Sequence, residues 1–212
     1  MNWRTISITG LILFLFAIAG TALVSFTYEN TRDRIAANER ATLLRKLHLL
    51  IEPARYDNNL FEDTVMLRDR ELTGTPGPVA VYRARKTSRP VALVLPAVAP
   101  GGYNGTIKLL VGINYDGTLT GVRVISHHET PGLGDGIEEE RSDWIHGFDG
   151  KSLGNPAMNR WQVKKDGGDF DQLTGATITP RAVVKAVKKS LLYYRAHRDT
   201  LFSTSGHRDN GQ

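Results

Sequence analysis

The chain has 212 residues, a formal net charge of +5 and 41% hydrophobic residues, which suffices for one medium-sized domain with a core and one or two appendages. It contains no cysteine, so disulfides, thiolate metal sites and iron–sulfur ligation by this chain are excluded. Its 27 Lys and Arg residues are spread along the chain rather than gathered in one block. We therefore predict no nucleic-acid partner.

The N-terminal segment, residues 1–28, is predicted to be a transmembrane anchor. No charged side chain occurs between Arg4 and Glu29, and residues 6–26 are long enough as a helix to cross a hydrocarbon core of about 30 Å. A cleaved signal peptide is the alternative, because residues 17–19 (Ala-Ile-Ala) resemble a cleavage site. The apolar run continues beyond that point, which favours a retained anchor. Charges on both sides of the segment leave its orientation undecided.

Residues 29–56 are predicted to form a stalk helix, because their apolar side chains recur at helical spacing until Pro53 ends the pattern. Residues 57–200 form the predicted soluble domain, and residues 201–212 a flexible tail. Four strands joined by turn-like connections are expected at residues 79–85, 91–98, 106–114 and 119–127. A further short strand is expected at residues 161–166. The predicted fold class is α+β, with an antiparallel sheet and flanking helices behind one anchor.

A helix is expected from Pro180 to about His197. Thr179 is its predicted N-cap and Pro180 its first helical residue, since proline suits that position and disfavours helical angles in the residue before it. Thr177 would then lie just outside the helix start, where backbone N–H groups from Arg181 onward and the helix dipole favour a phosphate.

Small residues precede this threonine. Gly175 and Ala176 leave room for a bulky phosphorylated group beside Thr177. The alternative is that Thr174 and Thr177 are turn and cap residues without chemistry. Neither a phosphate-binding P-loop nor a hydrolytic threonine fits, because no Gly-Lys-Ser/Thr follows and no base is nearby in the sequence.

Residues 171–177, Asp-Gln-Leu-Thr-Gly-Ala-Thr, resemble the flavinylation motif of the FMN-binding domain family. The resemblance implies that Thr177 carries FMN as a phosphoester, joined by a flavin transferase that uses FAD. Asp171 and Thr174 would belong to the part that the transferase recognises. The cofactor-site residues predicted in this segment are Asp171, Thr174, Gly175, Ala176, Thr177 and Thr179.

A second segment, His-Glu-Thr-Pro-Gly-Leu-Gly at residues 128–134, resembles another motif of the same family and follows a matching hairpin at residues 117–124. Its glycines let the backbone approach a flat ring, and the side chains of Glu129 and Thr130 can reach the polar edge of an isoalloxazine. The cofactor-site residues predicted here are His128, Glu129, Thr130, Gly132, Leu133 and Gly134.

A metal site is the competing interpretation of this second segment. The side chains of suitable type are those of His127, His128, Glu129 and Asp135. Adjacent histidines on a strand point to opposite faces and cannot easily share an ion, so no metal is predicted. No catalytic residue is predicted either, because a flavin carries electrons by its own chemistry. Core positions are expected for Trp144, Trp161 and Phe170, with shielding of a flavin ring as the alternative.

The whole chain resembles the RnfG family, a flavoprotein component of the Rnf-type (Rsx) ion-translocating electron transport complex. The resemblance implies a single-pass inner-membrane protein whose periplasmic domain relays electrons between other membrane and iron–sulfur subunits. It would be a component of an oxidoreductase that moves cations, without catalysis of its own when isolated. The alternatives are the sister flavoprotein of the sodium-translocating NADH:quinone reductase, a membrane-tethered domain that binds or senses an anion, and an assembly component without a redox role.

Overall fold

The computed structural model describes residues 3–203, without the side chain of Thr5. The chain divides into two compact units, with the boundary between Lys46 and Leu47. Where the sequence suggests an anchor followed by a stalk, the structure has one continuous helix, α1 (Trp3–Leu50). Its segment Ile6–Leu50 reaches a mean hydropathy of 2.3 and is the one helix within residues 3–203 that is long and apolar enough to cross a membrane.

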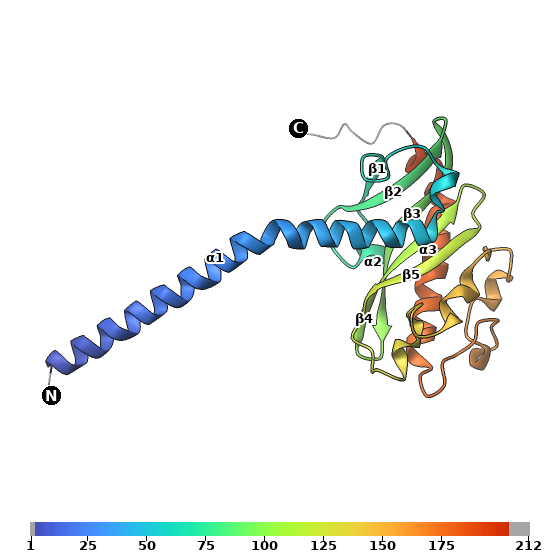
Figure 1. Cartoon of the computed structure of the whole chain (residues 1–212). Coiled ribbons are helices and arrows are strands. Elements are labelled where there is room, and N and C mark those ends of the chain that lie inside the picture. The colour runs from blue at the N-terminus through green and yellow to red at the C-terminus, as the bar shows by residue number, and fades with distance from the viewer. Residues whose placement is uncertain (1–2, 204–212) are drawn as a thin grey trace. The chain divides into compact units, whose positions relative to one another are not determined.

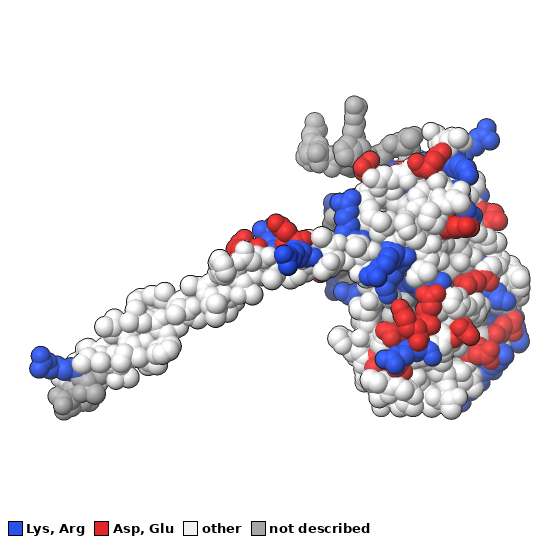
Figure 2. Space-filling view, viewed as in Figure 1, with Lys and Arg blue, Asp and Glu red and all other residues white. Residues whose placement is uncertain are grey.

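The apolar part of α1 has the surface of a membrane-anchored helix. Figure 2 shows a long stretch of it without any Lys, Arg, Asp or Glu. Its large side chains are exposed, with 74% of Phe16 and 67% of Leu23 accessible. Such a surface is stable in hydrocarbon and unfavourable in water, so this segment anchors the protein in a membrane.

Five antiparallel strands form the sheet of the second unit, in the order β1-β2-β3-β4-β5. They are β1 (Thr64–Leu67), β2 (Val79–Lys86), β3 (Arg89–Gly102), β4 (Gly105–Asn114) and β5 (Leu119–Ser126). Together with α2 (Arg70–Thr73) and α3 (Ile178–Phe202), this sheet confirms the α+β fold class. β3 is longer than expected, because a bulge after Ala99 lets residues 100–102 continue the strand instead of turning.

The prediction of a strand at residues 161–166 is wrong. Two short 3-10 helices, η4 (Met158–Arg160) and η5 (Lys164–Asp166), occupy this region, and Val163 makes a single bridge to Phe170. The chain folds back so tightly here that any side chain on Gly168 would overlap the carbonyl of Gln162. Periodicity cannot reveal a backbone contact of that kind.

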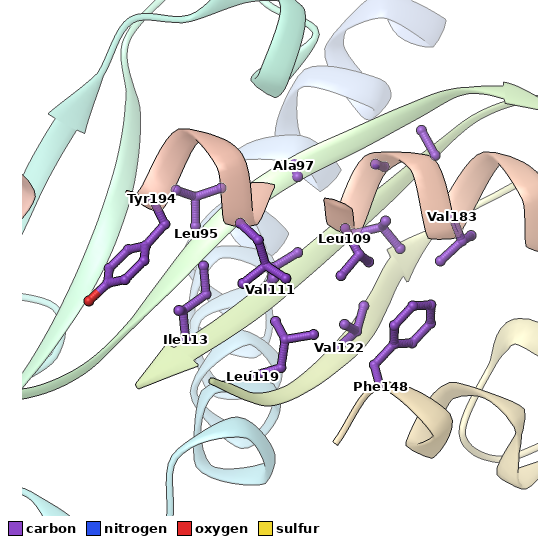
Figure 3. Close-up of a cluster of buried hydrophobic side chains, with 14 of the residues drawn as sticks. Leu95, Ala97, Leu109, Val111, Ile113, Leu119, Val122, Phe148, Val183 and Tyr194 are labelled. Atoms are coloured by element: carbon purple, nitrogen blue, oxygen red, sulfur yellow. The ribbon is translucent and has the colours of Figure 1, made fainter. Parts of the chain in front are cut away.

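The main core lies between the sheet and α3 (Figures 1 and 3). Leu109, Val111 and Ile113 alternate along β4 and point to one face, where they meet Val183 of α3. Each such side chain contributes about 1.5–3 kcal/mol when it is fully buried. Phe148, at the end of the 3-10 helix η3 (Asp143–Phe148), extends this core beyond the edge of the sheet.

An aromatic cluster joins the loops after β5 to this core. The ring centroids of Phe148 and Phe170 lie 4.9 Å apart, and those of Trp161 and Phe170 lie 4.8 Å apart. Trp161 and Phe170 are only 2% and 6% exposed, which confirms their predicted core positions. Trp144 is half-buried and packs edge-on against Phe148 at the border of the cluster.

The other face of the sheet receives the end of α1. Leu47, Leu50 and Ile51 are buried there, and two glycines leave room for Leu50. A Cβ on Gly112 would lie 3.2 Å from the Leu50 Cβ, and one on Gly121 would lie 3.3 Å from the Leu50 Cδ2. The last residues of α1 are therefore part of the soluble domain.

The C-terminal end of α3 differs from the flexible tail expected at residues 201–212. Leu201 and Phe202 belong to α3 and are 4% and 8% exposed. Arg85 donates from Nη2 to the carbonyl of Phe202 at 2.8 Å, and Arg83 donates from Nη1 to the carbonyl of Ser203 at 2.7 Å. The rest of the predicted tail, residues 204–212, lies outside the described residues.

The buried side chain of Tyr194 in α3 is expected to make the domain less stable at alkaline pH. It is 2% exposed, and its hydroxyl donates to the carbonyl of Tyr115 at 2.9 Å. Burial raises the pKa of Tyr194 above the usual value of 10.0. The folded state therefore keeps a proton that the unfolded state releases, so this contribution is complete below about pH 10 and is lost as the pH rises.

We expect the free energy of unfolding to fall more steeply above about pH 10 in the wild type than in Tyr194→Phe, which cannot ionise. Urea unfolding of the full chain in detergent at several pH values measures both slopes. Equal slopes would contradict this role of Tyr194.

Candidate functional site

A cavity of about 290 Å³ lies between the two motifs. It is lined by Tyr103, Glu129, Thr130, Leu133, Gly134, Gly175, Ala176, Thr177, Ile178 and Thr179. The fold thus brings residues 128–134, which follow β5, against residues 171–179, which begin α3. Two larger cavities of the domain do not contain Thr177.

The start of α3 differs from the prediction, and the Thr177 side chain has no capping role there. α3 begins at Ile178 with Thr177 at the N-cap, so the prediction of Thr179 as N-cap and Pro180 as first helical residue is wrong. Thr179 is fully buried inside the first turn, and its hydroxyl donates to the Glu129 carboxylate. Pro180 is tolerated in this turn because the N–H groups there have no intrahelical partner. The Thr177 side chain makes no capping hydrogen bond.

The backbone donors at this helix start also differ from those expected. The Arg181 N–H donates to the Thr177 carbonyl at 3.3 Å, so it is already used. Pro180 has no N–H. The N–H groups of Ile178 and Thr179 are therefore the helix-start donors without an intrahelical acceptor, next to Thr177.

A tight turn holds the loop that precedes Thr177. The Ala176 N–H donates to the Leu173 carbonyl at 3.1 Å, and Gly175 has a φ of 77°. Glycine adopts that angle without the strain other residues suffer. A Cβ on Gly175 would lie 3.0 Å from the Leu133 Cδ2, so the two motifs are in direct contact at this point.

The second motif contains its own turn. The Leu133 N–H donates to the Thr130 carbonyl at 3.1 Å, with Pro131 at the second position and Gly132, whose φ is 78°, at the third. Gly134 has a different role, because a Cβ there would lie 2.6 Å from the Glu129 Oε2. Gly132 therefore allows the backbone to turn, and Gly134 leaves space for the buried carboxylate of Glu129.

Glu129 joins the two motifs rather than standing free in the cavity. It is 5% exposed. Its Oε1 accepts the Asn104 N–H at 3.1 Å, and its Oε2 accepts the Thr179 hydroxyl. Both oxygens therefore have protein partners, so the side chain fixes the start of α3 against the loop after β5. Its contact with a flavin ring stays a prediction.

The two histidines lie beyond β5, which ends at Ser126, so the strand geometry assumed for them is not present. His127 accepts the Glu129 N–H on Nδ1 at 2.9 Å, so a neutral ring carries its proton on Nε2 and donates it to Glu138 at 2.9 Å. His128 is exposed. Within residues 3–203 no group of three or more His, Cys, Asp or Glu side chains could hold a metal ion.

The first residue of the segment 171–177 is held by a tryptophan that the sequence analysis does not assign to the site. The Trp144 Nε1–H donates to the carbonyl of Asp171 at 2.6 Å. The Asp171 carboxylate is exposed and pairs with the Lys164 ammonium at 2.5 Å. The backbone of the motif is thus fixed from inside, while its acidic side chain faces solvent, where another protein can reach it.

The electrostatics of the cavity are unusual for a phosphate site. None of its lining residues is Lys, Arg or His, and one of them, Glu129, is acidic. Proteins that bind a phosphate reversibly commonly pair it with Arg or Lys. Arg181, the nearest cation along the chain, forms a bidentate pair with Asp166 at 2.6 and 2.7 Å. The site therefore offers a hydroxyl and backbone donors, without a cation.

Two family models match the chain: the FMN-binding domain at residues 102–192 and the RnfG N-terminal region at residues 1–50. The first match contains both motifs and the cavity between them. Fold and site together define an FMN-binding domain, so the chain is a membrane-anchored flavoprotein.

Curated relatives match nearly the whole chain. The G component of the ion-translocating oxidoreductase complex from Pseudoalteromonas atlantica is 48% identical over 202 residues, which cover 95% of this chain and 94% of that protein. The proteins of the same name from Shewanella oneidensis and Pseudomonas aeruginosa are each 48% identical, and cover 92% and 94% of this chain and the same shares of their own. This chain belongs to the RnfG family, the G components of ion-translocating oxidoreductase complexes, which confirms the resemblance found in the sequence.

Proposed function

We propose that this chain carries FMN covalently on Thr177 and relays electrons through it between other redox groups of the complex. The protein is a component of an ion-translocating oxidoreductase complex and contributes an FMN-binding domain to it. Electron transfer in such a complex is coupled to movement of an ion across the membrane.

The observation that carries the covalent attachment is the state of Thr177. Its hydroxyl makes no capping bond although it occupies the N-cap position, where threonine usually makes one. It lies in a cavity without a basic side chain, where a free phosphate would bind weakly. A phosphoester to this hydroxyl would retain the cofactor without a cation, and the N–H groups of Ile178 and Thr179 would face its negative charge.

The remaining site residues position this group. When bound, FMN supplies one- and two-electron chemistry of its own. Gly175 and Ala176 leave space beside the attachment oxygen, and Leu133 and Tyr103 give the cavity an apolar wall. The bond between Glu129 and Thr179 keeps this wall and the attachment point together. None of these residues needs to act as an acid, a base or a nucleophile in electron transfer.

The proposed partners are a flavin transferase during maturation, and the other membrane and iron–sulfur subunits of the complex afterwards. The exposed motif loop supports the first of these, because Asp171, Thr174 and Gly175 are all accessible to another protein. We place the domain on the periplasmic side of the inner membrane, where a covalent bond prevents loss of the cofactor.

The alternative functions explain fewer of these observations. Family membership sets aside the sister flavoprotein of the sodium-translocating NADH:quinone reductase. An anion sensor that binds reversibly does not explain a cavity without cations. A pure assembly role does not explain why the Thr177 hydroxyl is free of a capping bond.

Membrane vesicles from cells in which Thr177→Ala replaces the wild-type protein test the electron relay. We expect electron-driven cation uptake to be abolished while the other subunits still purify together, since the Thr177 side chain has no capping bond to lose. Cation uptake by the Thr177→Ala vesicles at the wild-type rate would contradict an electron relay through Thr177. Disassembly of the complex would instead indicate an assembly role.

A further inference from the structure

A groove of about 760 Å³ runs between α2, the end of β3 and α3, and we call it the α2–α3 groove. Its floor is apolar, formed by Val98, Pro100, Gly101, Ala182 and Ala186. The floor is closed where a Cβ on Gly101 would lie 3.8 Å from the Ala182 Cβ. The floor of the groove therefore lies where β3 and α3 pack against each other.

The rim of the groove is basic. Arg70, Arg181, Lys185 and Lys189 line it, against one acidic residue, Glu71. Lys189 pairs with Glu71 at 2.8 Å, and Arg181 pairs with Asp166 at 2.6 Å. Arg70 and Lys185 have no ion pair with any residue in the described part of the chain. Two cations thus stand uncompensated beside exposed apolar surface.

The groove lies directly beside the proposed flavin attachment point. Ile178, the residue after Thr177, lines both the groove and the cavity between the motifs, and 45% of its surface is exposed. The groove residues of α3 recur mostly every three or four positions from Ile178 to Lys189, so they form one stripe that starts directly after Thr177. Whatever occupies the groove would lie next to the cofactor.

From this charge and position we infer that the α2–α3 groove docks an acidic segment of another subunit of the complex, with apolar side chains on the floor and carboxylates beside Arg70 and Lys185. The inference rests on the proposed function, because it places the docked segment next to the flavin on Thr177. An apolar centre with a charged rim is the usual organisation of a specific protein interface, and opposite charges select and orient the partner.

Carbodiimide cross-linking of the intact complex tests this contact, because it joins an amine to a carboxylate only when they touch. We expect mass spectrometry to find Lys185 joined to an Asp or Glu of another subunit. The second arm is the double variant Arg70→Glu/Lys185→Glu, which should release about tenfold more of this protein during purification in detergent, since it places like charges in the interface.

The matched control is Lys108→Glu/Arg195→Glu, which makes the same change of charge at exposed positions outside the groove. We expect it to behave as the wild type. The inference would be overturned if Arg70→Glu/Lys185→Glu stayed in the complex as firmly as the wild type. The absence of any cross-link from Lys185 would also overturn it.

Flavin fluorescence in denaturing gels separates this inference from the proposed function. A wild-type band without flavin would refute the covalent attachment and leave the cross-link to be judged by itself. A groove variant that loses its flavin would overturn the docking of another subunit, because the groove would then serve the cofactor or its transferase.

Discussion

Thr177→Ala is expected to abolish covalent flavin attachment completely. The oxygen that would form the phosphoester is removed, and no neighbouring hydroxyl occupies the same place, since Thr179 is buried against Glu129. Fold stability should barely change: losing a working N-cap costs about 1 kcal/mol, and the Thr177 side chain makes no capping bond. Fluorescence of the protein band in a denaturing gel, after expression with a flavin transferase, measures the loss.

Thr177→Ser is the matched control for this prediction. It keeps the hydroxyl and should retain a measurable part of the fluorescence. An equal loss in both variants would point to misfolding of the loop rather than to the missing oxygen. A fluorescent Thr177→Ala band would show that the flavin is attached elsewhere.

Thr179→Val is expected to lower the free energy of unfolding by about 2 kcal/mol, because it leaves a buried carboxylate without one of its two donors. The change preserves the shape of the side chain but removes its O–H. Glu129 is 5% exposed and cannot turn to water without disturbing Gly134, which lies against it. Urea unfolding of the full chain in detergent measures the change.

Two further variants separate the hydrogen bond from simple packing. Thr179→Ser keeps the donor and should lose far less stability than Thr179→Val. In a double-mutant cycle, Glu129→Leu together with Thr179→Val should be less destabilising than the sum of the single changes, since no carboxylate remains to be satisfied. Additive effects would contradict a direct bond between Glu129 and Thr179. Flavin attachment should follow stability through this series, because the bond joins the two motifs.

The broad architecture could be predicted from the sequence, because strong periodic signals produce it. The uncharged N-terminal run became the apolar part of α1, and the alternating segments became β2 to β5. The sequence does not predict β1, since its four residues are too few to show alternation and lie in a mixed, polar region. The strand expected at residues 161–166 failed because a tight backbone fold, not side-chain pattern, determines that region.

The candidate site could be predicted as a set of residues but not as an arrangement. The two motifs do meet at one cavity. The prediction that Thr179 is the N-cap is wrong. The sequence cannot show that the buried carboxylate of Glu129, fifty positions earlier, accepts its hydroxyl. For the same reason, the sequence predicts a core position for Trp144 but not its hydrogen bond to the Asp171 carbonyl. Long-range polar contacts leave no local signal.

Peptide mass mapping of the native protein tests the central claim most directly. The purified full-length protein is digested, and the peptide that contains residues 171–179 is fragmented. We predict a mass increase equal to one FMN less one water, located on Thr177 and absent from Thr174. An unmodified peptide from a yellow protein, or a flavin located on another residue, would contradict the account.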